Sequence, residues 1–173
     1  YTLKNGTVAE PDMYLGAQVK KWYFEGSDDP KKPRWAMSSE LYVKRAVGDV
    51  EMELHKVDRV LPTKVTTPMS QSYRPEIDQT PELNADRGQY YQSLIGVLRW
   101  ICELGRLDVL VATSMLSRYV VSPREGHLQQ LYHVFAYLKH HNRSTMVFDD
   151  TEPMFDERRF RVVDWSEFYP DAA

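Results

Sequence analysis

Residues 11–24 alternate between apolar and polar positions. Leu15, Ala17 and Val19 fall on one side of the chain, with polar residues or glycine between them. A side-chain period of two predicts a strand with one buried face. Turn-forming residues follow, and then a second short apolar segment at 34–37. The pattern therefore predicts an antiparallel β-hairpin with a loose loop.

A helical pattern begins after the hairpin and gives way to a proline-rich connector. Ser38 or Ser39 is placed to cap a helix that runs to about residue 54, because a hydroxyl there accepts a hydrogen bond from an unpaired N–H group. Apolar residues repeat at helical spacing and form one stripe: Val43, Val47, Val50 and Leu54. Residues 61–84 contain four prolines among many polar residues. A connector of this length needs a surface to lie on, and we expect the full-size molecule to supply it.

Residues 85–143 have the clearest helix punctuation, which predicts three helices. The first spans about 86–104 and ends before Gly105, a residue suited to a helix C-terminus. The second starts with Asp108 as its cap and runs to about residue 120.

The third predicted helix has the strongest start signal. Ser122 is its N-cap, Pro123 takes the first helical position, and Glu125 completes a capping box. A strand at 145–148 follows, with 160–163 as a candidate antiparallel partner. The fold class predicted from these elements is α+β: an N-terminal β-hairpin, a mainly α-helical bundle and short C-terminal β-strands.

Composition places the chain among soluble globular proteins. Hydrophobic residues make up 42% of its 173 residues, charged residues 27%, and the mean hydropathy is −0.54. No apolar run approaches the roughly 18 residues of a membrane span. A single cysteine excludes an internal disulfide framework and favours an intracellular location. The chain does not begin with methionine, and we expect it to be a fragment of something longer.

Charge is unevenly distributed along the chain. The net charge is −3, yet residues 85–143 carry 7 Lys and Arg against 4 Asp and Glu. Residues 144–173 carry 3 against 8. The helical block is therefore net positive, which suits phosphate contacts or an ordinary solvated helix face. The tail is net acidic.

The residues do not specify an enzyme. Cys102 lies on the apolar side of a predicted helix, so we expect it to be buried and inert. His127 and His133 are six residues apart, whereas helical metal pairs are three or four apart, and we predict no metal site. The carboxylate pairs at 28–29 and 149–150 sit among turn residues, which position catalytic groups poorly.

Gly16, in the run Tyr14-Leu15-Gly16, has two interpretations. A glycine on a strand lets another backbone or a nucleic-acid strand approach closely. It also suits a tight bend within a hairpin.

Three phrases identify the chain with a known family. YQSLIGVLRW, GRLDVLVATSMLSR and SPREGHLQQLYHVFAYLK occur in this order at residues 91–139. They resemble the region that follows the polymerase palm in copia-type retrotransposon polyproteins. Tyr14-Leu15-Gly16 resembles the primer-grip hairpin of these reverse transcriptases, and Thr67-Pro68 resembles the connector of their thumb.

The resemblance implies four segments. Residues 1–37 would end the palm with the primer-grip-like hairpin, and 38–84 would hold the first thumb helix and the Pro-rich connector. Residues 85–143 would form a three-helix thumb and connection block, and 144–173 would begin the connection to ribonuclease H. The Y-x-D-D motif, whose aspartates bind magnesium (Mg²⁺) in the family's palm, does not occur in this chain. Magnesium is therefore expected in the parent RNA-directed DNA polymerase, and no cofactor is expected in this fragment.

A thumb clasps the primer–template duplex through phosphates and sugars. The resemblance thus implies an RNA–DNA or DNA duplex as partner, together with the rest of the polymerase chain, in a cytoplasmic particle or the nucleus and without a membrane. Basic residues on the outer helix faces are the candidate phosphate contacts: Arg99, Arg106, Arg118, Arg124 and Lys139. Arg124 and the free N–H groups at the start of the third helix favour an anion, whereas Glu125 opposes one. Arg106 is also placed to pair with Asp108.

A second hypothesis is a degenerate or domesticated retroelement remnant that acts as a helical protein-interaction module. The net negative charge and the acidic, aromatic tail favour this alternative.

Overall fold

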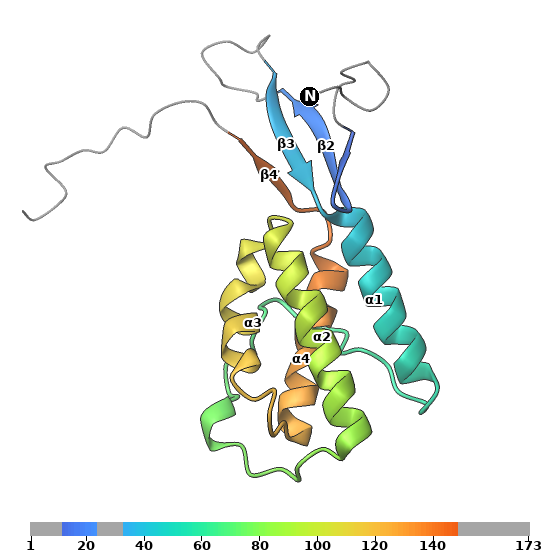
Figure 1. Ribbon diagram of the computed structural model, residues 1–173, viewed down its shortest axis with the longest axis vertical. Coiled ribbons are helices and arrows are strands. Elements are labelled where there is room, and N and C mark those ends of the chain that lie inside the picture. Colours follow the sequence, from blue (N-terminus) through green and yellow to red (C-terminus); the bar gives the residue numbers. More distant parts are fainter. Residues whose placement is uncertain (1–11, 24–32, 149–173) are drawn as a thin grey trace, which may run out of the picture.

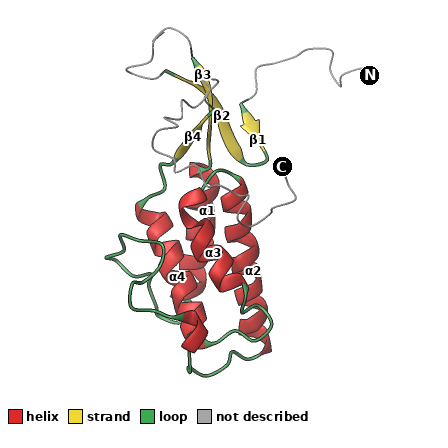
Figure 2. Ribbon diagram, turned by 90° about the vertical axis from the view of Figure 1, so that its left-hand side faces the viewer, coloured by secondary structure: helices red, strands yellow, loops and turns green. Residues whose placement is uncertain are grey.

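A small antiparallel sheet stands on one end of a four-helix bundle (Figure 1). The computed structural model describes residues 12–23 and 33–148. Helices α1 and α3 run away from the sheet, and α2 and α4 run back toward it (Figure 1). The turned view in Figure 2 shows the same two parts, with strands above and helices below. The predicted α+β class is confirmed.

The sheet contains four strands in the order β1-β2-β3-β4, and all neighbours are antiparallel. The strands are β1 (Met13–Tyr14), β2 (Ala17–Trp22), β3 (Arg34–Ser38) and β4 (Thr145–Val147). The predicted hairpin between the first two apolar segments is confirmed, with Val19 opposite Met37.

Two details of the strand predictions need correction. The single strand predicted at 11–24 is wrong, because the chain reverses at Leu15-Gly16 and forms β1 and β2 instead. The strand predicted at 145–148 exists and pairs with β3 from the other end of the chain. Its candidate partner at 160–163 lies outside the described residues.

Helix α1 (Glu40–His55) buries the predicted stripe, since Val43, Val47, Val50 and Leu54 are all buried. Its N-cap residue is Ser39, but the Ser39 side chain makes no capping hydrogen bond. The neighbouring Ser38 hydroxyl accepts from the Glu40 N–H at 3.4 Å instead.

Three further helices complete the bundle, namely α2 (Ala85–Glu103), α3 (Leu110–Ser117) and α4 (Glu125–His140). The start of α2 is capped by Asn84, whose side chain accepts from the Arg87 N–H. A 3₁₀ turn, η2 (Leu107–Val109), precedes α3. The prediction that Asp108 caps this helix is therefore wrong, because Val109 is its N-cap.

The predicted start of α4 is also wrong. Arg124, not Ser122, is the N-cap, and the side chain at N3 that accepts the Arg124 N–H is His127, through Nδ1 at 3.0 Å. Sequence spacing favoured Ser122 because Ser-Pro-x-Glu is a common helix start. The helix begins later because the connector supplies partners for its first N–H groups.

One hydrophobic core joins all four helices. It contains residues from both sides of the predicted boundary at 84, including Val43 and Leu54 of α1 with Leu98, Leu131 and Phe135. A smaller cluster lies where the sheet meets the bundle, formed by Ala17, Met37 and Leu104 with Tyr42 and Met146 packed against it. The division of the chain into four segments stays a prediction.

The proline-rich connector lies on α4. His127 Nε2 contacts the Pro75 carbonyl at 3.1 Å, and His133 Nε2 contacts the Thr67 carbonyl at 3.0 Å. A 3₁₀ turn, η1 (Pro75–Ile77), begins at the residue that His127 contacts. The connector does need a surface, as predicted, but a helix of this chain provides it.

No helix in the described ranges is long and apolar enough to cross a lipid bilayer.

Candidate nucleic-acid interface

The predicted phosphate contacts fall at opposite ends of the bundle. Arg99 and Lys139 lie in the halves of α2 and α4 nearer the sheet, whereas Arg118 and Arg124 lie at the far end (Figure 1). Since α4 has 16 residues, the two ends are separated by about 20 Å. The structure therefore does not gather these residues into one basic patch.

Three of these four cations are exposed, and two of the four are already engaged in ion pairs. Arg99 and Arg118 are exposed and form no ion pair with another described residue. Lys139 Nζ lies 2.7 Å from Glu51 Oε1 and ties α4 to α1. Arg124 donates to the Thr80 carbonyl at 2.7 Å and to Glu82 at 3.1 Å.

The N-terminus of α4 is filled by the connector. The Glu125 N–H donates to the Pro81 carbonyl at 3.0 Å, and the Gly126 N–H donates to the Thr80 hydroxyl at 2.8 Å. The Glu125 carboxylate pairs with both terminal nitrogens of Arg87. The expectation of free N–H groups for an anion at this helix start is therefore wrong.

Asp78 holds the connector in this position. Its carboxylate accepts hydrogen bonds from the Thr80 N–H at 2.8 Å and from the Tyr73 hydroxyl. Burial alone would raise the pKa of Asp78, but the hydrogen bonds from Thr80 and Tyr73 leave that pKa below its ordinary value. Burial and the neighbouring Asp78 carboxylate raise the pKa of Tyr73. The carboxylate is thus stabilised as an anion within the chain.

Tyr14-Leu15-Gly16 forms the tight turn that the sequence offered as one of two interpretations. Tyr14 pairs with Ala17, and both central residues have positive φ, 51° at Leu15 and 97° at Gly16. These angles are those of a type I′ hairpin turn. A leucine in this conformation costs about 1–2 kcal/mol, and its side chain is 58% exposed. The turn therefore presents an apolar side chain at a cost in stability, at the end of the sheet that meets the bundle, where Gly16 lies beside Tyr42 of α1.

An open polar cavity of about 610 Å³ lies at the sheet end of the bundle. Its lining joins the start of α1, the turn after α2 and the end of α4. It contains five residues that carry or can carry positive charge: Lys44, Arg106, His140, His141 and Arg143. The sequence predicted the pairing of Arg106 with Asp108, but no spacing along the chain predicts that these five residues meet.

Arg106 forms the inner wall of this junction cavity. It is 1% exposed and binds Asp108 through two nitrogens, Nε at 2.9 Å and Nη2 at 2.7 Å. Burial alone would raise the pKa of Asp108, but the Arg106 guanidinium holds it below its ordinary value. The predicted pairing of Arg106 with Asp108 is confirmed. The predicted exposure of Arg106 on an outer helix face is wrong.

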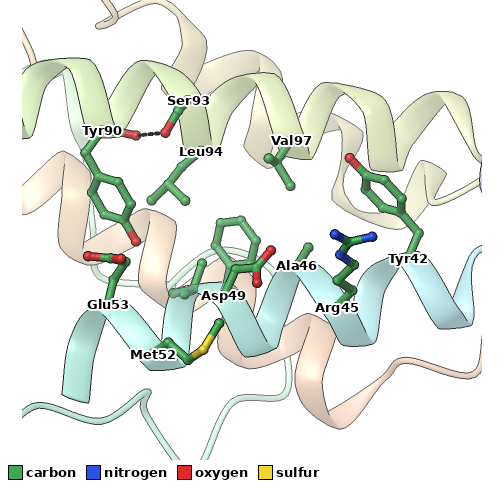
Figure 3. Close-up of a pocket in the computed structure, with 12 residues that line it drawn as sticks. Tyr42, Arg45, Ala46, Asp49, Met52, Glu53, Tyr90, Ser93, Leu94 and Val97 are labelled. Carbon is green, nitrogen blue, oxygen red and sulfur yellow. Dashed lines mark hydrogen bonds between the residues drawn. The ribbon is translucent and has the colours of Figure 1, made fainter. Parts of the chain in front are cut away.

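A second cavity of about 450 Å³ lies between α1 and α2 (Figure 3), and Phe135 of α4 is among its lining residues. Apolar side chains such as Leu94 and Val97 face Met52 and Ala46 across it (Figure 3). The Tyr90 hydroxyl is buried without a hydrogen-bond partner among the described residues. Burial raises the pKa of Tyr90, so the phenol stays neutral.

The described residues hold no group of three or more potential metal ligands. Cys102 is buried, as predicted, and its thiol contacts the Thr113 hydroxyl at 3.7 Å. Burial raises the pKa of the Cys102 thiol, which disfavours the reactive thiolate.

Comparison with known proteins gives one distant relative. The chain is 29% identical over 103 residues to the "Putative transposon Ty5-1 protein" of Saccharomyces cerevisiae. The match covers 59% of this chain and 30% of the yeast protein, so the chain spans less than a third of that protein's length. No family model matches the chain, and no solved structure matches it. The chain is therefore related at a distance to a yeast Ty5 transposon protein.

Proposed function

We propose that this chain is a noncatalytic part of a copia-type retrotransposon reverse transcriptase, which binds the primer–template duplex and connects neighbouring domains. The similarity to the yeast Ty5-1 protein carries the proposal, together with the three phrases at residues 91–139. These phrases correspond to α2, to η2 and α3, and to α4 in the structure.

Exposed basic residues of the bundle would hold a duplex at separate points, through its phosphates and without reading its sequence. Phosphate and sugar contacts fix the position of a protein on nucleic acid. Arg99 and Arg118 are exposed and form no ion pair with other described residues, so they are the best placed of the predicted contacts. Arg124 and Lys139 would have to exchange their present partners, Glu82 and Glu51, for phosphate.

The turn between β1 and β2 is the second element of the proposed interface. Tyr14 and Leu15 are both more than half exposed, and they lie at the turn that resembles a primer grip. An exposed apolar pair next to strand β2, which carries Lys20 and Lys21, suits contact with the sugars and bases at a primer end. Catalysis and the magnesium it needs would belong to the rest of the polymerase.

Binding of an RNA–DNA hybrid to the 173-residue chain tests this proposal. We expect binding that weakens as salt rises, because protein cations displace the counterions of phosphates. Arg99→Gln and Arg118→Gln should each reduce the slope of log K against log salt by about 1. Arg45→Gln removes the same charge from an exposed position on α1 and serves as the matched control.

Salt-independent binding, or none, both in this chain and in a longer segment with the upstream polymerase region, would contradict the proposal. Equal effects of Arg45→Gln and Arg99→Gln would also contradict it, because they would show attraction by overall charge alone.

One observation favours the alternative function of a helical protein-interaction module. Leu107, Leu110 and Val111 form a contiguous apolar group on η2 and the first turn of α3, and they are 62%, 48% and 68% exposed. Exposed apolar groups commonly mark protein contacts. Under this alternative, Val111→Ser would abolish association with a partner protein. It would leave binding of the hybrid unchanged.

A further inference from the structure

Arg106 has one nitrogen that the described part of the chain leaves without a hydrogen-bond acceptor. This nitrogen, Nη1, is buried, while Nε and Nη2 of the same guanidinium bind Asp108. Buried N–H donors in folded proteins nearly always have an acceptor. Because the side chain is 1% exposed, bulk water does not supply one freely. The donor lies in the wall of the junction cavity.

The groups around Arg106 are rich in donors, and they include the Tyr137 hydroxyl, which interacts with both Arg106 and Asp108. Lys44 comes from the first turns of α1, His140 and His141 end α4, and Arg143 follows them. Asp108 is the only carboxylate in the described lining, and Arg106 already binds it. Outside the lining, Glu40 contacts Lys44 at 2.7 Å and Arg143 at 3.9 Å. With the histidines counted as neutral, Lys44, Arg106 and Arg143 outnumber the carboxylates of Asp108 and Glu40. The cavity is therefore net positive.

The helix dipole explains only part of this arrangement. The carbonyl end of α4 stabilises nearby cations, which accounts for the exposed His140, His141 and Arg143. It does not account for a fully buried guanidinium with an unsatisfied nitrogen. The same dipole works against a bound anion, so the side chains would have to supply the attraction.

We propose that the junction cavity binds an oxyanion of the phosphate class, with Arg106 Nη1 as its innermost donor and Lys44 and Arg143 as its flexible cations. A phosphate group has several acceptor oxygens and suits donors that converge from three elements, whereas a carboxylate has two. The phosphate is either inorganic or part of a nucleic-acid backbone. The site does not rest on the proposed function, because it would remain if the chain bound no duplex.

Titration of the 173-residue chain with inorganic phosphate, at constant ionic strength, tests the site. The Arg106 Nε–H resonance, followed by ¹H–¹⁵N NMR, should shift and saturate. Since Arg106 variants risk unfolding, the test uses Lys44→Gln and Arg143→Gln, which change exposed side chains. Each should weaken phosphate binding by about threefold to tenfold, as expected for loss of a charged contact. Arg45→Gln, one residue along α1 and outside the cavity lining, should change it by less than about twofold.

If the Arg106 Nε–H resonance does not shift and saturate with phosphate, the proposal is overturned. This result is expected if a carboxylate from elsewhere in the chain already accepts a hydrogen bond from Arg106 Nη1. Equal weakening by Arg45→Gln and Lys44→Gln would overturn it too.

Addition of an RNA–DNA hybrid then identifies the source of the phosphate. In one outcome, the hybrid displaces inorganic phosphate, and Lys44→Gln weakens binding of both the phosphate and the hybrid. That outcome would assign the site to a backbone phosphate. Saturable phosphate binding without any binding of the hybrid would assign it to free phosphate. That second outcome would retain the site and reject the proposed duplex-binding function.

Discussion

The Asp78 carboxylate lies so close to Gly126 that a methyl group on Gly126 would overlap it. Gly126 is in the first turn of α4, and Asp78 is in the connector. The absence of a side chain at Gly126 therefore lets the connector close over the start of the helix. This contact explains why α4 begins at Glu125, where connector atoms replace the capping groups predicted at Ser122.

Gly126→Ala is expected to destabilise the chain by about 1–2 kcal/mol, the cost of disturbing the Asp78 hydrogen bonds to Thr80 and Tyr73. In an Asp78→Ala background the same substitution should instead be neutral, or stabilising by up to about 1 kcal/mol, because alanine favours a helix more than glycine does. Urea unfolding of the two single variants and the double variant measures this coupling. Additive effects would show that the two residues do not interact.

His127 should be the neutral tautomer with its proton on Nε2. Its Nδ1 accepts the Arg124 N–H, and its Nε2 faces the Pro75 carbonyl at 3.1 Å. The ring also stacks on Tyr119 with centroids 4.1 Å apart. Long-range ¹H–¹⁵N NMR distinguishes protonated from unprotonated ring nitrogens. A proton on Nδ1 in the folded chain would contradict this arrangement.

Asp108→Asn should destabilise the fold by about 3 kcal/mol, because it leaves the buried Arg106 guanidinium without its counterion. The double variant Arg106→Met with Asp108→Asn should recover most of this loss, since no buried charge remains. Thermal unfolding of these two variants and of the wild type, compared at one pH, measures both effects. A double variant less stable than Asp108→Asn would contradict the explanation.

Stability should also fall in acid. The pKa of Asp108 is lowered below its ordinary value of 3.8, and that of Asp78 is lowered as well. A carboxyl group whose pKa is lower in the folded than in the unfolded chain stabilises the fold above about pH 4. This stabilisation is lost as the pH falls through the folded-state pKa. The free energy of unfolding of Asp108→Asn should therefore depend less on pH than that of the wild type below about pH 4. Parallel curves would assign the acid sensitivity to other groups.

Leu15→Asn should stabilise the chain by about 1 kcal/mol, because Asn-Gly suits a type I′ turn and asparagine tolerates positive φ better than leucine. If the turn between β1 and β2 contacts the primer end, as proposed, the same substitution should weaken binding of an RNA–DNA hybrid. Urea unfolding and hybrid titration on the same sample separate the two effects. A gain in stability with unchanged binding would contradict the proposed contact.

The regular elements were predictable from local pattern. The valine stripe of α1 and the span of α2 follow from side-chain periodicity, and they match within one or two residues. The hairpin between β2 and β3 follows from alternation. Gly105, expected at the C-terminus of α2, has the positive φ of 96° that this position favours.

The elements that depend on distant partners were not predictable in this way. The start of α4 is decided by Thr80 and Pro81, more than forty residues earlier. The pairing of β4 with β3 joins opposite ends of the described chain. Likewise, Lys44, Arg106 and Arg143 meet only because α1, the turn after α2 and the end of α4 converge below the sheet. The spacing of residues along the sequence does not reveal which distant elements meet in the fold.

The pairing of β3 with β4 also affects the order in which the chain can fold during synthesis. Ser38 and its partner Ser144 are 106 residues apart. At about 5–20 residues per second, a ribosome needs about 5–20 s to make the intervening chain. During that interval the outer edge of β3 has no partner strand, and the apolar stripe of α1 has no α4 to cover it. A nascent chain in this state exposes the type of surface that molecular chaperones bind.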